Sequence, residues 1–167
     1  LTAYEWAYQN GITTMDTYEK ARIMDPITRE EMAKMISVYV MIFLDKKPDL
    51  TKSACSQFED LSVTTVEMQH YMTLSCQLGL MGMNGDGVGV QLRFNPYPWL
   101  TRAEAGSVLS RMFWGLQYAQ LPSDVTYYGK HLQALKKAGI MNYISDPSLL
   151  ELRGNIFLML YRLETEK

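Results

Sequence analysis

The stretch Leu100-Thr-Arg-Ala-Glu104, followed by the apolar segment Ala105 to Trp114, decides the fold. It places a Thr at the N-cap of a helix and a Glu three residues later, which is the pattern of a capping box. The same pattern occurs at Thr28-Arg-Glu-Glu31, before the apolar segment Met32 to Leu44. We therefore expect a helix to begin at each place, with an acidic side chain in its positive first turn. The expected capping residues are Thr28, Glu31, Thr101 and Glu104.

Outward from this stretch, the same order of parts occurs three times. An amphipathic segment ends in Gly followed by Ile or Leu, a turn-rich connector leads to Asp-Pro or Asn-Pro, and an Arg opens a second apolar segment. The glycines are suited to the positive φ of a helix C-terminus. They are Gly11, Gly79 and Gly139, and the arginines are Arg29, Arg102 and Arg153. The chain is therefore predicted to repeat one helix-loop-helix unit, with its two helices packed as a hairpin.

These patterns predict an all-α fold. The expected helices cover residues 2–10, 28–45, 64–78, 101–115, 124–138 and 148–163. The last of them lacks a capping box around Arg153, so we expect it to begin near Pro147-Ser148. Residues 88–94 alternate in polarity but are interpreted as an insertion loop. The predicted units cover residues 1–50, 51–119 and 120–167 and together form one compact module.

The second unit carries the fullest set of landmarks: Phe58-Glu-Asp60, Leu78-Gly-Leu-Met-Gly82, Phe94-Asn-Pro96 and Leu100-Thr-Arg-Ala-Glu104. In this order they resemble the S-layer homology (SLH) repeat. The first unit matches from Ala3 through Tyr39, as an N-terminally truncated repeat. The third keeps only Ala138-Gly-Ile140, Asp146-Pro147 and Arg153. The resemblance implies three SLH-type repeats in a pseudo-threefold arrangement, with the second helix of each unit in a central three-helix bundle.

The resemblance also implies a function. SLH modules bind secondary cell-wall polysaccharide, often pyruvylated, in grooves between repeats, where the motif Arg contacts the anionic group. The matching residues here are Arg29, Arg102 and Arg153. Aromatic residues suited to stacking on sugars near these grooves are Tyr97, Trp99, Tyr127 and Tyr128. We therefore expect a non-catalytic anchoring module at the extracellular cell surface or cell wall, with polysaccharide as its partner and no cofactor.

Departures from the SLH pattern keep a second function open. The Trp that usually opens the first helix is missing from the second and third units, and the third unit is degenerate. The chain could instead be a structural module of a surface layer or filament that acts through protein contacts without glycan. For Arg29 and Arg102 themselves, the alternative to a ligand role is that they tie neighbouring helix ends together through carboxylates or carbonyls. An enzyme is the least favoured class, because no catalytic motif or phosphate loop is recognisable.

Composition excludes several other classes. The 167 residues carry 16 Lys and Arg against 18 Asp and Glu, a net charge of −2, which argues against a nucleic-acid binder. The longest apolar run, Met35 to Leu44, is too short to span a bilayer. The residues His70 and His131 form no metal-ligand spacing with the cysteines. Leu1 is interpreted as a processed end or as part of a longer chain.

Cys55 and Cys76 are the two cysteines of the chain. Their pattern alone leaves two alternatives open, namely two buried thiols or one disulfide. Because the SLH resemblance implies export, it favours the disulfide.

Overall fold

The computed structural model describes residues 1–165, so the last two positions of the predicted unit 120–167 lie outside the described residues. Within the described part of the chain the regular structure is helical, and extended segments meet only in isolated bridges. No helix among these residues is long and apolar enough to cross a membrane. The elements are α1 (Thr2–Gln9), α2 (Arg29–Phe43), η1 (Ser53–Ser56), η2 (Leu61–Val63), α3 (Val66–Gln77), α4 (Arg102–Trp114), α5 (Gly129–Lys137) and α6 (Arg153–Thr165).

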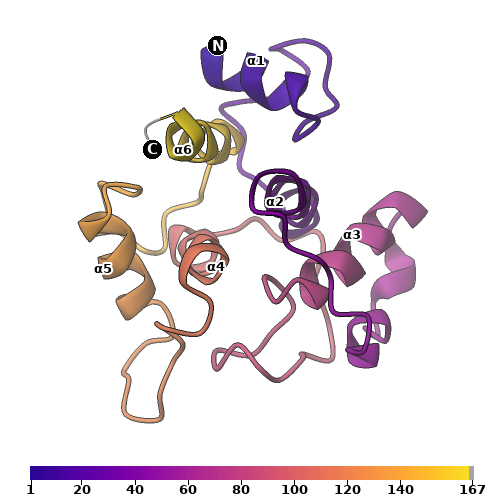
Figure 1. Cartoon of the computed structure of the whole chain (residues 1–167), viewed down its shortest axis with the longest axis vertical. Helices are drawn as coiled ribbons and strands as arrows, with labels where there is room; N and C mark the ends of the chain where they lie inside the picture. The colour runs from indigo at the N-terminus through magenta and orange to yellow at the C-terminus, as the bar shows by residue number, and fades with distance from the viewer. Residues whose placement is uncertain (166–167) are drawn as a thin grey trace.

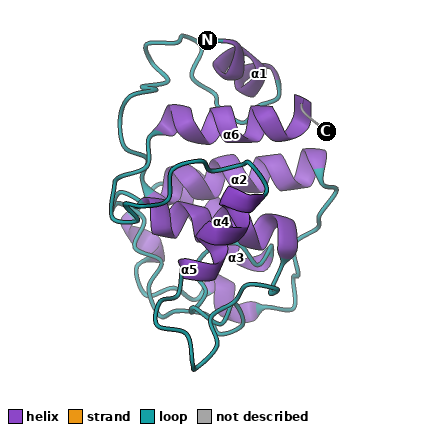
Figure 2. Ribbon diagram, turned by 90° about the vertical axis from the view of Figure 1, so that its left-hand side faces the viewer, coloured by secondary structure: helices purple, strands orange, loops and turns teal. Residues whose placement is uncertain are grey.

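The helices α2, α4 and α6 lie next to one another in the middle of the molecule. Figure 1 shows them end-on, with α1, α3 and α5 outside them, and Figure 2 shows them running in about the same direction. Each of the three inner helices contributes fully buried apolar side chains to the core, whose burial is the main stabilising contribution. Examples are Ile36, Tyr39, Ala105, Leu109, Ile156 and Leu160.

Each outer helix packs on an inner helix of a neighbouring predicted unit. α1 contacts α6, α3 contacts α2, and α5 contacts α4. The expectation that the two helices of one unit form a hairpin is therefore wrong. The connector between those helices is long enough for the first helix to reach a different inner helix, so the units interlock.

The three connectors meet just before the inner helices. The amide of Ile27 donates to the carbonyl of Glu151 (3.0 Å), the amide of Leu100 to the carbonyl of Ile27 (2.9 Å), and the amide of Glu151 to the carbonyl of Leu100 (2.9 Å). These bonds form a closed cycle. Because each inner helix begins two residues after a member of this cycle, the cycle holds the three helix N-termini close together.

Both predicted capping boxes are present. The Thr28 side chain accepts from the Glu31 amide and the Glu31 side chain accepts from the Thr28 amide, and Thr101 and Glu104 repeat the arrangement. Each box satisfies amides that an α-helix leaves free at its N-terminus. The predicted glycines also adopt positive φ, for example +76° at Gly79.

The third unit corrects two predicted boundaries. α6 begins at Arg153 and not near Pro147-Ser148, because the preceding chain is extended against the start of α4: the carbonyl of Leu149 accepts from the Arg102 amide at 2.8 Å. α5 begins at Gly129 and not at residue 124. The preceding residues form turns closed by Asp124 and Thr126, whose side chains accept from the amides of Leu121 and Gly129.

Cys55 and Cys76 form a disulfide with a Cα–Cα distance of 5.5 Å. Both residues are fully buried. The bond joins η1 to the last turn of α3, and so fixes the segment that precedes α3 against that helix.

Candidate ligand-binding site

Each of the three motif arginines lines a different cavity. The Arg29 cavity has a volume of about 350 Å³, the Arg102 cavity about 160 Å³ and the Arg153 cavity about 50 Å³. One wall of each cavity is the segment that follows a helix-ending glycine: residues 81–85, 140–143 and 12–15, respectively. The three cavities therefore use equivalent parts of the predicted units.

The opposite wall of each cavity is the first half of another inner helix. In α4 it is Glu104, Ser107 and Val108, which are the second, fifth and sixth residues after Arg102. The same three positions of α6 line the Arg102 cavity, and the same three of α2 line the Arg153 cavity. They are Asn155, Leu158 and Met159 in α6, and Glu31, Lys34 and Met35 in α2.

All three arginines are engaged with carboxylates. Arg29 pairs with Glu104 at 3.3 Å, Arg102 with Glu151 at 3.6 Å, and Arg153 with Glu31. Each pair joins the start of one inner helix to the start of another. This geometry agrees with the alternative in which Arg29 and Arg102 tie neighbouring helix ends together, and Arg153 does the same.

Each arginine also donates to a backbone carbonyl of a neighbouring connector. The acceptors are Phe94 for Arg29 (2.9 Å), Tyr143 for Arg102, and Ala21 for Arg153 (2.8 Å). The side chain of Arg153 is only 5% exposed, against 16% for Arg29 and 15% for Arg102. Burial, and next Arg22, lowers the pKa of Arg153 to about 10, so Arg153 stays charged at neutral pH.

Glu151 is a residue of the candidate site that the sequence analysis missed. It takes the place of the missing capping Glu of the third unit, although it precedes Arg153 instead of following it. Its side chain is fully buried, and its Oε1 accepts from Asn155 Nδ2 at 2.8 Å. The only signal in the sequence was an acidic residue just before the third motif arginine.

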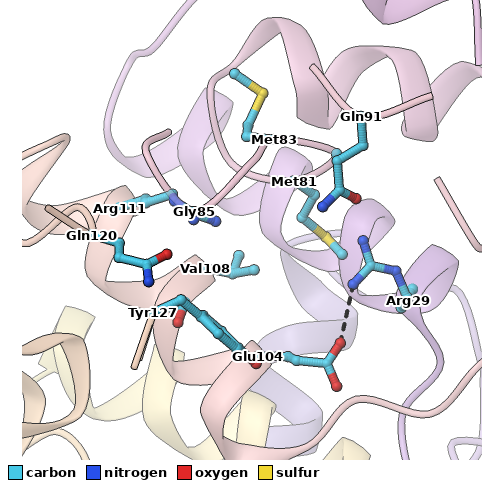
Figure 3. A pocket seen from close by; sticks show the side chains of 12 residues that line it. Arg29, Met81, Met83, Gly85, Gln91, Glu104, Val108, Arg111, Gln120 and Tyr127 are labelled. Atoms are coloured by element: carbon cyan, nitrogen blue, oxygen red, sulfur yellow. Dashed lines mark hydrogen bonds and ion pairs between the residues drawn. The ribbon is translucent and has the colours of Figure 1, made fainter. Parts of the chain in front are cut away.

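The Arg29 cavity is the largest of the three and has mixed walls (Figure 3). Gln91, Gln120 and Tyr127 provide neutral polar groups, and Met81, Met83 and Val108 provide apolar surface. Burial, followed by the neighbouring Glu104 carboxylate, raises the pKa of Tyr127, so its hydroxyl is neutral at physiological pH. Such a mixture of apolar surface and few polar groups is typical of small-molecule sites.

Arg111 is the second residue of the candidate site that the sequence analysis missed. It lies on α4 and lines the Arg29 cavity (Figure 3). The residue is only 9% exposed. Its Nη2 donates to the carbonyl of Asn84 at 3.5 Å, and its buried Nε has no hydrogen-bond partner in the part of the chain that the structure describes. A charged residue inside the apolar pattern of Ala105 to Trp114 was the signal that could have identified it.

The predicted aromatic residues separate into two groups. Tyr127 lines the Arg29 cavity. The ring centroid of Tyr128 lies 5.2 Å from that of Tyr127. Tyr97 and Trp99 line none of the three cavities, and they are 55% and 56% exposed. The structure therefore brings Arg29 and Tyr127 together, and leaves Tyr97 and Trp99 on the outer surface.

His131 does not contribute to an accessible site, whereas His70 lies exposed on α3. His131 is fully buried between α4 and α5, where its Nδ1 lies 2.6 Å from Ser110 Oγ. Burial, helped by Arg111 and Lys130, lowers its pKa to about 4. Nowhere in residues 1–165 do three or more His, Cys, Asp or Glu side chains gather closely enough to hold a metal ion.

Comparison with protein-family models, with curated proteins and with solved structures gave no match to this chain. The properties of the candidate site therefore rest on the contacts and charges of its own residues.

Proposed function

We propose that this chain is a non-catalytic cell-surface module that binds envelope polysaccharide in grooves between three SLH-type repeats in a pseudo-threefold arrangement. The observation that carries the proposal is the set of three cavities with equivalent walls, each holding a motif arginine. The closed cycle of connector hydrogen bonds supports the threefold relation. So does the interlocked contact of each outer helix with an inner helix.

Two features support an extracellular carbohydrate ligand. Buried disulfides persist in exported proteins and are rare in the reducing cytosol, so the Cys55–Cys76 bond favours export. The Arg29 cavity also combines guanidinium and amide groups with apolar side chains. That combination suits a pyranose, which offers hydroxyls at its rim and C–H groups on its faces.

A sedimentation assay with purified cell-wall polysaccharide tests this proposal. The polysaccharide should carry the protein into the pellet, and removal of its pyruvyl groups should weaken binding. Arg29→Ala should bind less than the control Arg93→Ala, because Arg93 lies outside the cavity and is 65% exposed. Equal sedimentation with intact and depyruvylated material, and with both variants, would contradict the groove model.

The ion pairs favour one alternative, a structural module that assembles through protein contacts. All three motif arginines are already bound to carboxylates, and the aromatic side chains of Tyr97 and Trp99 are exposed outside the grooves. This alternative predicts self-association without glycan, and Trp99→Ser should reduce it. Light scattering that shows a monomer at all concentrations, together with polysaccharide binding, would exclude it.

A further inference from the structure

We propose that the Arg29 cavity is a binding site for one singly charged carboxylate of an acidic sugar, and that Arg111 is the residue that binds this carboxylate. This inference rests on the proposed function and deepens it in two ways. It moves the anion contact from the motif arginine to Arg111, and it gives the chain one anion site instead of three.

The state of Arg111 is the first argument. Its guanidinium lies in the wall of a cavity of about 350 Å³, yet no carboxylate among residues 1–165 lies within ion-pair distance of it. Its side-chain hydrogen bond to the Asn84 carbonyl is long at 3.5 Å, and its Nε has no hydrogen-bond partner among the same residues. A buried cation without a counter-ion is costly, and a bound anion would remove that cost.

Asp86 lies in the loop that follows Asn84, and its carboxylate already accepts hydrogen bonds from backbone amides. Asp86 interacts with Arg111 electrostatically, but its Oδ1 accepts from the amides of Val88 and Gly89 at 2.9 and 3.1 Å. These bonds close the turn after Asn84, and they lower the pKa of Asp86. Asp86 therefore shapes the loop over Arg111 without pairing with it.

The charges lining the cavity indicate a monoanion. Two guanidinium groups, those of Arg29 and Arg111, line it, and Glu104 pairs with Arg29. One positive charge remains, on Arg111. A planar guanidinium can donate two parallel hydrogen bonds to a carboxylate. The neutral side chains of Gln91, Gln120 and Tyr127 lie around it and are suited to sugar hydroxyls.

The other two cavities lack this arrangement. Nine residues after each motif arginine, α4 has Arg111, whereas α2 has Val38 and α6 has Arg162. Arg162 lines the Arg102 cavity but is exposed to solvent, where an anion gains little from it. In the Arg153 cavity the remaining cation, Lys34, is paired with Glu67 at 2.7 Å. These differences restrict the anion site to the Arg29 cavity.

Calorimetric titration with two defined probes tests the inference. One probe is a methyl hexoside that carries a pyruvate ketal, and therefore one carboxylate, and the other is the same hexoside without the ketal. The wild-type chain should bind one charged probe per molecule. Arg111→Gln should weaken this binding by about tenfold or more, and Arg111→Lys by less, because Lys keeps the charge but loses the paired donors. Arg93→Gln is the matched control and should bind as the wild type does.

An NMR titration of His131 gives a readout that a purely structural role of Arg111 would not change. The charge of Arg111 contributes to the low pKa of His131. A carboxylate bound at Arg111 offsets that charge, so the charged probe should raise the pKa of His131 and the neutral probe should not. If Arg111→Gln fails to fold, Arg111→Lys and this titration still decide the question.

The outcomes separate this inference from the proposed function. If polysaccharide sediments wild type and Arg111→Gln equally, the Arg111 site is wrong and the glycan function stands. If the charged probe binds through Arg111 but no polysaccharide sediments the protein, the anion site stands and the glycan function is wrong. If neither probe nor polysaccharide binds the wild type, both are wrong. Binding of two or three probes per chain would overturn the single-site claim.

Discussion

The Arg29 cavity and the Arg153 cavity use equivalent positions of the chain, but their charges are arranged differently. At the Arg153 cavity every cation has a carboxylate partner, and a volume of about 50 Å³ remains. At the Arg29 cavity one of two guanidinium groups has no carboxylate partner within residues 1–165, and the volume is about 350 Å³. The difference teaches that one helix-start motif can either close an interface or leave a site, depending on whether its charges are balanced.

The largest expected effect is a difference in the free energy of unfolding between variants of the two cavities. Arg153→Ala should lower the free energy of unfolding by about 4 kcal/mol. It removes the ion pair with Glu31, the bond to the Ala21 carbonyl and the packing of a side chain that is only 5% exposed, although Glu31 keeps its pair with Arg22 at 3.2 Å. Arg111→Gln should change it by only about 1 kcal/mol or less, since Arg111 has no ion pair to lose among the described residues. Urea denaturation with both variants measures the contrast, and equal losses would break the comparison.

The disulfide gives the next effect. The double variant Cys55→Ser, Cys76→Ser should lose about 3 kcal/mol of stability, because the unfolded chain is no longer cross-linked. The bond lies beside α3, whose end leads into the wall of the Arg29 cavity. Reduction of the disulfide in the wild type should lower the free energy of unfolding by a similar amount. A double variant as stable as the wild type would show that the interlocked helices alone fix this region.

Acid should lower the free energy of unfolding because of the buried residue His131. The pKa of His131 is lowered from 6.5 to about 4, so below pH 6.5 the unfolded chain binds a proton that the folded chain does not. Stability is therefore lost as the pH falls from about 6.5 toward 4. The loss between pH 7 and pH 5 should be about 2 kcal/mol.

Urea denaturation at several pH values measures this loss. His131→Gln should remove most of the pH dependence in this range, whereas His70→Gln should keep it. An unchanged pH dependence in His131→Gln would contradict the assignment.

The smallest expected effect comes from the glycines that precede the loop walls of the Arg29 and Arg153 cavities, and it should be equal at both. Gly79 and Gly11 have φ of +76° and +72°, and a Cβ at either position would meet nothing within 4 Å. Gly79→Ala and Gly11→Ala should therefore each cost about 1 kcal/mol, from backbone strain alone. Thermal denaturation of both variants tests this equality. A much larger cost at one glycine would mean that the two loop walls are not equivalent.

The local parts of the fold could be predicted from the sequence. The Thr-x-x-Glu boxes place the starts of α2 and α4, because the capping bonds join residues three apart. The helix-ending glycines follow from the positive φ that their positions need. The all-α class follows from these signals together.

Features that depend on neighbouring units could not be predicted. The start of α6 is set by hydrogen bonds between the segment before it and α4, far away in the sequence. The pairing of Glu151 with Arg102 and the engagement of all three motif arginines likewise arise between units. Arg111 is part of no recognised sequence motif, so only the folded structure shows that it lies in the cavity wall.

The contact between α1 and α6 joins the first and last helices within residues 1–165. The two helices are far apart in the sequence, so non-covalent contacts alone hold this interface together. Opening of this interface would expose the α6 surface that α1 covers, and the α1 of a second molecule would be complementary to that surface. Exchange of this helix between molecules would link them head to tail without any new surface, which is a route to concentration-dependent polymers from a unit that otherwise closes on itself.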